Sequence, residues 1–286
     1  MDLNLFKYVK LKGYFLKLIV TMVIFVIALV GIILIVGKQR LKPSSGYILS
    51  IMPLVINLAL LIITLGELKK NNISIKDVIG RPKKKSFIFE VPISLILTYI
   101  AGIGMILILL YIVYRINPGI VQNFNKGLKD TYEKAPNSFI MTIDFVDTVL
   151  LAPILEEIIF RGILLSKLYN KYGIIRAIIF TSGIFFMIHF RSNPMTFAIG
   201  ITNCILVLKY KSLIPAIICH GLNNLFVFMK TMGNKVSSNE AVPFEVNIAF
   251  LITGMIMIGI YALYIYKNRS YIRNANLSKS GLIDYL

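Results

Sequence analysis

The chain has 286 residues, of which 57% are hydrophobic and 15% charged, and its mean hydropathy is +0.78. Soluble globular domains carry fewer apolar and more charged residues, so the composition excludes that class and indicates a membrane protein. The formal net charge is +18. Because the basic residues lie in short clusters between long apolar runs, we expect them to face membrane lipids, and we expect no nucleic-acid partner.

Eight segments are apolar enough to be candidate transmembrane helices, for which about 20 apolar residues are needed. They cover residues 14–36, 46–66, 87–114, 139–166, 173–190, 194–208, 212–229 and 246–266. The sixth segment is short, because Pro194 and Lys209 bracket it. The sequence therefore predicts an all-α fold, a polytopic transmembrane bundle of about eight helices.

The basic residues also predict the orientation of these helices. If the N-terminus is cytoplasmic, the inside segments hold roughly twice as many Lys and Arg as the outside segments, which favours cytoplasmic placement of both termini. Residues 116–138 would then form a polar outside loop. The two cysteines, Cys204 and Cys219, lie in apolar runs without metal-type spacing, and we interpret them as core residues.

Two adjacent carboxylates and a guanidinium lie within the fourth apolar segment, in the stretch APILEEIIFRG at residues 152–162. Each ionised side chain near the bilayer centre costs about 2.5 to 3.5 kcal/mol on insertion scales, so these three must face the protein interior. Residues four apart share a helix face, whereas adjacent residues diverge by about 100°. We therefore predict that Glu157 pairs with Arg161 and that Glu156 points elsewhere.

The two histidines of the chain, His189 and His220, lie in apolar segments as well, and Asn224 follows His220 by four residues. At about 1.5 Å per residue, Glu156, His189, His220 and Asn224 all lie roughly 13 to 20 Å from the nearest basic residue expected in the cytoplasm. Different helices thus place polar groups in one layer. This agreement favours a functional site over a structural ion-pair cluster.

Glutamate, two histidines and an amide suit the hydrolysis of an acyl compound such as a peptide bond. A carboxylate in apolar surroundings can act as a general base on water, one histidine can orient that water, and the other can join the amide in stabilising an oxyanion. A zinc site with Glu156, His189 and His220 as ligands is the competing interpretation, although no HExxH pattern is present. Nucleophilic Ser182 or Cys219 is disfavoured, because neither lies in a reactive-residue motif.

Three motifs carry a resemblance to a known family. EEIIFR at 156–161 fits EExxxR, FFMIH at 185–189 fits FxxxH, and HGLNN at 220–224 fits HxxxN. In this order and spacing they resemble the CPBP family of intramembrane proteases, also called the Abi or type II CAAX prenyl endopeptidase family. The resemblance covers a four-helix catalytic core at 139–229, with transmembrane helices and loops before it at 1–138, and the last helix and a cytoplasmic tail after it at 230–286.

The resemblance implies roles for the motif residues. Glu156 would activate water, His189 would help to hold it, and His220 with Asn224 would stabilise the oxyanion. The site-shaping residues would be Glu157, Arg161 and Phe185.

The function implied by the resemblance is an intramembrane endopeptidase that acts on a membrane-associated or small peptide substrate. The substrate would be a CAAX-type lipidated protein or a peptide pheromone or bacteriocin precursor. No cofactor is favoured, and Zn²⁺ is the alternative, because accounts of the family differ on metal dependence. The composition, rich in Ile and Lys, favours the bacterial branch and a bacterial cell membrane. The alternative function is a non-catalytic bacteriocin immunity or peptide-export accessory protein.

Other polar residues in the apolar segments have a structural interpretation. Asp144 and Asp147, near the expected outer end of the fourth helix, are predicted to be solvated at the interface. Asn57 and Asn203 are predicted to make hydrogen bonds between helices.

Overall fold

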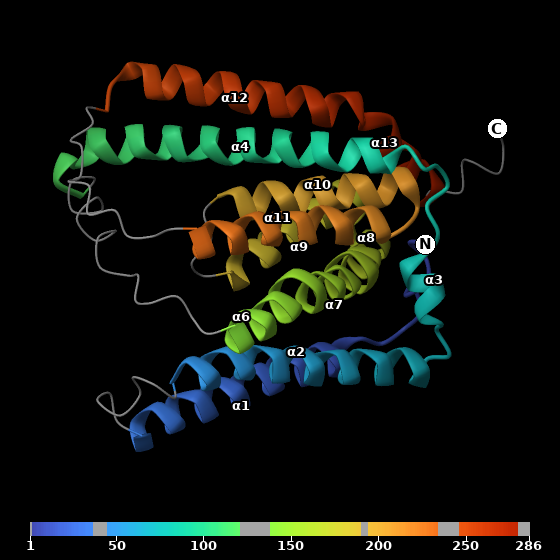
Figure 1. Ribbon diagram of the computed structural model, residues 1–286. Coiled ribbons are helices and arrows are strands. Elements are labelled where there is room, and N and C mark those ends of the chain that lie inside the picture. Colours follow the sequence, from blue (N-terminus) through green and yellow to red (C-terminus); the bar gives the residue numbers. More distant parts are fainter. Residues whose placement is uncertain (1, 37–44, 121–137, 190–193, 234–245, 280–286) are drawn as a thin grey trace.

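The computed structural model describes residues 2–36, 45–120, 138–189, 194–233 and 246–279, and within these ranges it contains helices and no strand (Figure 1). The predicted all-α fold is confirmed. Most of the expected outside loop at 116–138 lies outside the described residues. The α-helices and two π-helical segments, labelled η, are α1 Lys12–Val36, α2 Ser45–Lys70, α3 Ile75–Ile79, α4 Phe87–Ile116, α6 Ser138–Phe145, η1 Val146–Leu151, α7 Ala152–Glu157, η2 Ile158–Leu164, α8 Leu165–Tyr172, α9 Ile174–Ile188, α10 Met195–Tyr210, α11 Ile214–Gly233, α12 Ile248–Lys267 and α13 Arg269–Lys279.

Five stretches are long and apolar enough to cross a membrane, at Lys12–Ile32, Ile51–Lys70, Phe87–Ile116, Ser138–Tyr172 and Ile248–Lys267. Three shorter apolar helices, Ile174–Ile188, Met195–Tyr210 and Ile214–Lys230, correspond to the remaining predicted segments. The chain is therefore an integral membrane protein.

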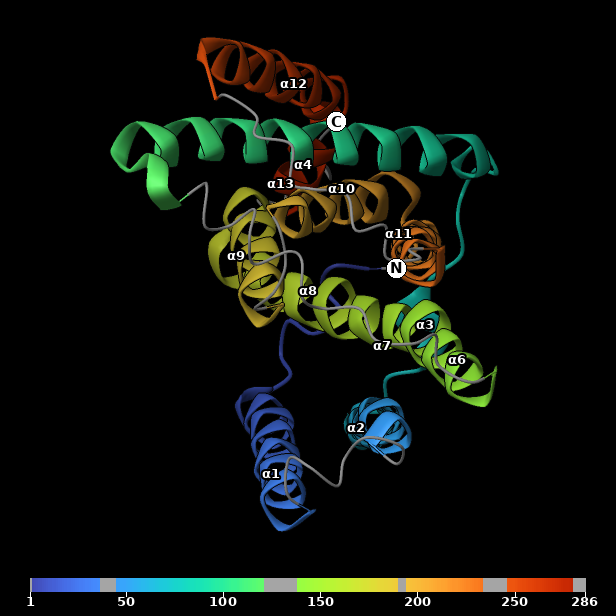
Figure 2. The same cartoon turned by 60° about the vertical axis from the view of Figure 1, so that its left-hand side comes forward.

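The helices form layers around α10 (Figures 1 and 2). On one side of the bundle, α12 lies along α4, and on the other side lie α2 and α1. Between them, α10 packs against α4, α9 and α11. Almost every side chain of α10 from Ala198 to Leu208 is buried, as expected of an apolar helix surrounded by other helices.

Buried hydroxyl groups join α4, α10 and α12. Thr98 Oγ1 and Thr202 Oγ1 lie 2.7 Å apart, and the Tyr261 hydroxyl lies 2.8 Å from Thr202 Oγ1. Thr98 also donates to the carbonyl of Ser94 in its own helix, and Tyr261 donates to the carbonyl of Ala198. These polar contacts fix α4 relative to the central helix α10.

The segment Ser138–Tyr172 runs as one long helical rod whose α-helical geometry is interrupted twice. The Ala152 N–H donates to the Asp147 carbonyl, and the Leu165 N–H to the Phe160 carbonyl, so both hydrogen bonds span five residues. Such π-helical turns hold an extra residue and rotate the positions that follow relative to a regular α-helix. The short helix α7, which carries Glu156, lies between them.

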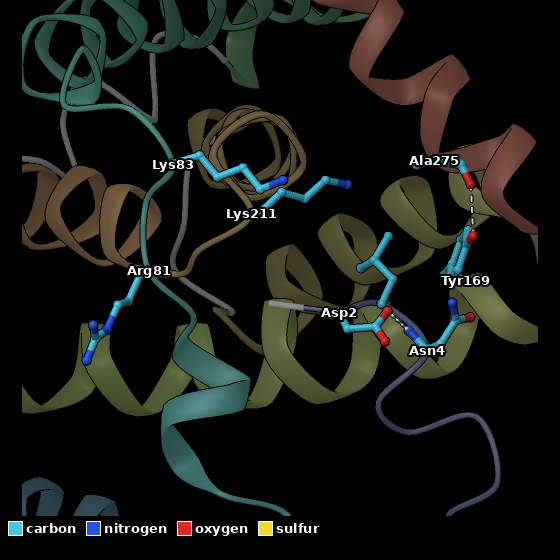
Figure 3. A pocket seen from close by; sticks show the side chains of 8 residues that line it. Asp2, Asn4, Arg81, Lys83, Tyr169, Lys211 and Ala275 are labelled. Carbon is cyan, nitrogen blue, oxygen red and sulfur yellow. Dashed lines mark hydrogen bonds between the residues drawn. The ribbon is translucent and has the colours of Figure 1, made fainter. Parts of the chain in front are cut away.

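At one end of the bundle the start of the chain meets the α3–α4 linker and the α10–α11 turn. A cavity of about 290 Å³ lies there, with Arg81, Lys83 and Lys211 among its lining residues, together with Asp2 and Tyr169 (Figure 3). Burial lowers the pKa of Lys211, and the nearby charge of Lys83 lowers it further. Neither histidine lines this basic cavity, so it is separate from the polar residues of the fourth apolar segment and the two histidines.

Candidate functional site

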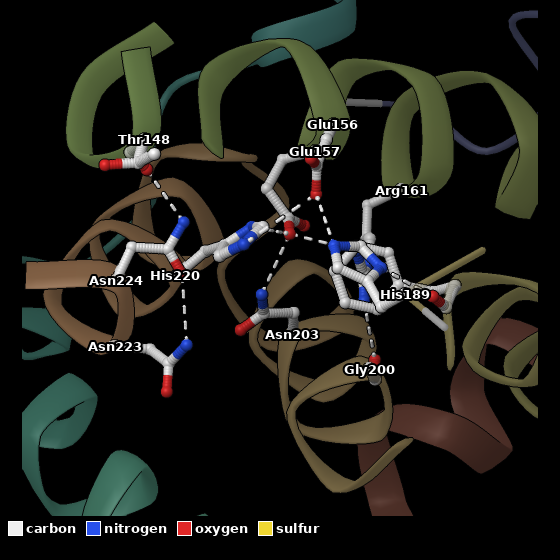
Figure 4. Close-up of polar contacts among 11 residues, drawn as sticks. Thr148, Glu156, Glu157, Arg161, His189, Gly200, Asn203, His220, Asn223 and Asn224 are labelled. Atoms are coloured by element: carbon white, nitrogen blue, oxygen red, sulfur yellow. Dashed lines mark hydrogen bonds and ion pairs between the residues drawn. The ribbon is translucent and has the colours of Figure 1, made fainter. Parts of the chain in front are cut away.

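Glu157 forms the fully buried half of the polar cluster. Its Oε1 atom accepts hydrogen bonds from Arg161 Nη1 at 2.9 Å and from Asn203 Nδ2 at 2.9 Å, and lies 3.0 Å from His220 Nδ1 (Figure 4). The predicted pair between Glu157 and Arg161 is confirmed, and both side chains are 0% exposed. A buried carboxylate is tolerated only when its charge is compensated in this way.

The guanidinium of Arg161 has two further contacts. Nη2 donates to the Gly200 carbonyl on α10 at 3.3 Å, and the group lies 4.4 Å from the centre of the Phe185 ring. A Cβ on Gly200 would lie only 2.8 Å from the Cβ of Ser182, so glycine lets α10 approach α9 at this point. A larger side chain at this position would push α10 away from α9 and from the buried ion pair.

Phe185 contacts the guanidinium of Arg161 and the rings of both histidines. Its ring centre is 4.5 Å from that of His189 and 5.6 Å from that of His220, in addition to its contact with Arg161. Phe185 is 1% exposed. It therefore packs against the buried guanidinium and supports both imidazole rings.

Glu156 points to a different set of partners. Its Oε2 atom lies 3.6 Å from His189 Nε2 and 3.8 Å from His220 Nε2 (Figure 4). This oxygen is buried, and among the described residues it has no hydrogen-bond partner. The side chains of Glu156 and His189 are 23% and 33% exposed, whereas His220 is 4% exposed. The structure thus brings an acid and two imidazoles together from α7, the end of α9 and α11.

The hydrogen bonds of the two Nδ1 atoms fix the orientation of the rings. His189 Nδ1 lies 2.7 Å from the Phe185 carbonyl, which can only accept, so Nδ1 must carry the proton. His220 Nδ1 faces the Glu157 carboxylate in the same manner. Each ring, when neutral, therefore directs the lone pair of Nε2 toward Glu156.

Asn224 is one helical turn beyond His220 on α11, and its Nδ2 atom donates to the Thr148 carbonyl on η1 at 2.8 Å. It lines the same cavity as the two histidines.

That cavity has a volume of about 970 Å³ and is bounded by α4, α9, α10 and α11. Apart from the polar groups at one end, its wall is mainly apolar and aromatic, with Leu95, Ile96, Tyr99, Ile199 and Phe226 among the lining residues. A cavity of this size accommodates a ligand larger than water next to the imidazoles.

For two residues, Asn203 and Asp147, the structure extends or corrects the role predicted from the sequence. Asn203 makes the interhelical hydrogen bond predicted for it, but its partner is Glu157, so it belongs to the polar cluster. For Asp147, the prediction of solvation at the interface is wrong, because the residue is 3% exposed and accepts a hydrogen bond from Asn57 Nδ2 at 2.8 Å. In both cases the signal in the sequence is an amide side chain, Asn203 or Asn57, within an apolar segment. The residue to which this amide donates becomes known only when the packing of the helices is known.

Within the described part of the chain, no group of three or more His, Cys, Asp or Glu side chains is arranged to hold a metal ion. The zinc ligand set considered above, Glu156, His189 and His220, is not among groups so arranged in the described residues.

The comparisons with known proteins point to one family. Residues 138–226 match the sequence model described as type II CAAX prenyl endopeptidase Rce1-like. No curated protein and no solved structure matches the chain. The matched residues run from α6 into α11 and include Glu156, His189, His220 and Asn224. This family suggests an intramembrane endopeptidase. Over residues 138–226, the chain is similar to the Rce1-like family of type II CAAX prenyl endopeptidases.

Proposed function

We propose that this protein is an intramembrane endopeptidase in which Glu156 activates the water that hydrolyses a peptide bond. The observation that carries the proposal is the position of Glu156 Oε2, which faces the Nε2 atoms of two histidines at 3.6 and 3.8 Å. Its neighbour Glu157 is held by Arg161 and cannot serve as the base without breaking the buried pair.

In the first step, Glu156 Oε2 takes a proton from a water molecule, and the water oxygen adds to the carbonyl carbon of the peptide bond. The π electron pair of the carbonyl moves to its oxygen. Neutral His189 accepts a hydrogen bond at Nε2 from the hydrogen that the water oxygen keeps, because its own proton lies on Nδ1 and is donated to the Phe185 carbonyl. The ring thereby orients the water before the reaction begins.

The resulting oxyanion needs hydrogen-bond donors. Asn224 Nδ2 has two hydrogens, of which one is donated to the Thr148 carbonyl, so the other is available to the substrate. His220 is the second donor in this proposal: its Nδ1 contacts Glu157, and a proton on Nε2 would point to the oxyanion. When the intermediate collapses, the C–N bond breaks and the leaving amine takes from Glu156 the proton that came from the water. One water is consumed, and a carboxylic acid and an amine are formed.

The proposed substrate is a membrane-associated or small peptide, either a CAAX-type lipidated protein or a peptide pheromone or bacteriocin precursor. The apolar wall of the 970 Å³ cavity supports this class, because it can bury an apolar side chain or a lipid group beside the scissile bond. The name of the matched family supports the lipidated form. We place the protein in a bacterial cell membrane with both termini in the cytoplasm.

The test is cleavage by the purified protein in liposomes, with a fluorogenic apolar peptide offered both with and without a farnesyl group. We expect the wild-type protein to cleave one of the two, and Glu156→Gln to lower the rate by about 10²- to 10⁴-fold, the usual contribution of a general base. Asp77→Asn on α3, an exposed carboxylate outside the membrane spans, is the matched control and should leave the rate unchanged. A correctly inserted Glu156→Gln protein that cleaves at the wild-type rate would refute the proposal.

A chelator arm of the same assay separates the two chemical versions. If Glu156 activates the water without a metal, the chelator should leave the cleavage rate unchanged. A loss of activity that added zinc restores would support the metalloprotease version. If no peptide is cleaved, and protection or export in cells survives both His189→Ala and His220→Ala, the non-catalytic immunity or accessory function would replace the enzyme.

A further inference from the structure

A chain of side-chain hydrogen bonds connects α4 to the site. The Tyr99 hydroxyl donates to Asn223 Oδ1 at 3.2 Å, and Asn223 Nδ2 donates to Asn224 Oδ1 at 3.1 Å. The chain ends where Asn224 Nδ2 donates to the Thr148 carbonyl at 2.8 Å; Figure 4 shows the two asparagines and Thr148. Tyr99 lies outside the matched segment 138–226, so this contact extends the site to a helix that the family comparison does not cover.

The direction of every hydrogen bond in this chain follows from its last acceptor. A backbone carbonyl cannot donate, so Asn224 must present its nitrogen to Thr148 and its oxygen to Asn223. Asn223 must then present its nitrogen to Asn224 and its oxygen to the Tyr99 hydroxyl. Rotation of either amide by 180° would set oxygen against oxygen or nitrogen against a donor, and the chain as a whole therefore fixes both amides.

The Thr148 carbonyl is available because of the π-helical turn. In an α-helix its partner would be the Ala152 N–H, but that group donates to Asp147. In the π-helical register its partner would be residue 153, which is proline and has no N–H. Pro153 and η1 thus leave one carbonyl of the rod free to accept from Asn224.

Close packing of α11 against η1 brings the amide within reach. A Cβ on Gly221 would lie 3.2 Å from the Val149 carbonyl oxygen, a distance that is tighter than most real contacts. Glycine at this position therefore lets the backbone of α11 approach the rod, and Asn224, one turn further on, reaches the carbonyl of Thr148.

We propose that Tyr99 is a positioning residue of this active site, which orients the amide of Asn224 through Asn223. The proposal rests on the proposed function, in which Asn224 donates to the oxyanion. A donor fixed in advance stabilises the transition state without having to reorganise, so loss of the Tyr99 hydroxyl should lower kcat. Tyr99 also lines the cavity and its ring packs edge-on against Phe226, and Tyr99→Phe would retain this wall.

The kinetic test compares Tyr99→Phe, Asn224→Ala and the double variant in the liposome assay. We expect Tyr99→Phe to lower kcat by about three- to tenfold, the range of one neutral hydrogen bond, with KM unchanged because the ring remains. Asn224→Ala should lower kcat more, and adding Tyr99→Phe to it should have no further effect. Tyr111→Phe, also on α4 but not among the residues that line the cavity, is the matched control and should behave as wild type.

Two results would overturn the positioning role while leaving the protease intact: a wild-type kcat in Tyr99→Phe, or equal losses from Tyr99→Phe in the presence and absence of Asn224. Failure of the proposed function is a different outcome, namely no cleavage by any form of the protein.

A thermal-unfolding cycle in detergent tests the hydrogen-bond chain without relying on activity. Tyr99→Phe and Asn223→Ala should lower the melting temperature by amounts that do not add in the double variant. Additive shifts would show that the two side chains are not coupled and would overturn the proposal even for a protein with no measured substrate.

Discussion

Glu156 and Glu157 are neighbours in the chain and belong to opposite halves of the site. Glu157 is 0% exposed and shares one oxygen among Arg161, Asn203 and His220. Glu156 is partly exposed, and its buried Oε2 faces two imidazole nitrogens at distances longer than a hydrogen bond. The first environment holds a charge in place, whereas the second leaves a carboxylate oxygen available for proton transfer.

The difference arises because adjacent residues on a helix diverge by about 100°. α7 therefore directs Glu157 toward the buried face of α10 and Glu156 toward the imidazoles at the edge of the cavity. His220 contacts both halves, with Nδ1 on Glu157 and Nε2 on the side of Glu156. The buried half thus determines the ring orientation that the reacting half needs.

Removal of the buried guanidinium should have the largest effect on stability. Arg161→Met leaves Glu157 as an uncompensated charge in the bundle, and removing one partner of a buried pair costs about 3 to 5 kcal/mol. We expect a strongly lowered melting temperature in detergent, together with poor insertion.

The control is the double variant Glu157→Leu/Arg161→Met, which leaves no lone charge and should recover part of the loss. If the single and double variants unfold at the same temperature, the pair does not compensate a buried charge in the way described here.

His189→Gln should separate the two halves most clearly in kinetics. The side chain is a third exposed, and its Nδ1 donates to the Phe185 carbonyl of the same helix, so the melting temperature should change little. The rate should fall by about 100-fold, because the water loses the group that orients it. His220→Gln should lower both the cleavage rate and the melting temperature, because the His220 ring is buried against Glu157. Equal stability losses in the two variants would contradict this assignment.

Asn203→Leu should have a smaller effect on stability, and a still smaller one on the chemical step. It removes one of the donors to Glu157 Oε1, and a hydrogen bond to a charged group contributes about 1.5 to 3 kcal/mol. We expect a lowered melting temperature with the cleavage rate of the folded protein largely retained, as measured below the unfolding transition. A large loss of kcat without destabilisation would place Asn203 in the reacting half instead.

The sequence predicted the apolar segments and the buried pair because both depend on local properties. Helix length follows from the thickness of the hydrocarbon, and a charge in an apolar run must find a partner, which for Glu157 lies four residues away at Arg161. The proximity of Glu156, His189 and His220 could be anticipated from their matching depths along different helices. These predictions did not require the packing of the bundle to be known.

The parts that could not be predicted depend on how helices pack. Residues around Glu156 are nearly all apolar, so their pattern does not reveal the extra residue of a π-helical turn. The burial of Asp147 depends on Asn57 of α2, ninety residues earlier in the chain. Tyr99 gave no signal of its link to Asn224, because an aromatic residue in a transmembrane segment is ordinary.

The central claim, that the two adjacent glutamates divide catalysis from structural support, is tested by one matched measurement on Glu156→Gln and Glu157→Gln. Both variants make the same chemical change at neighbouring positions, and the melting temperature and the cleavage rate per folded molecule are measured for each. The account predicts a near-normal melting temperature without cleavage for Glu156→Gln, and a lowered melting temperature with residual cleavage for Glu157→Gln. The opposite pattern, or the same pattern in both variants, would contradict it.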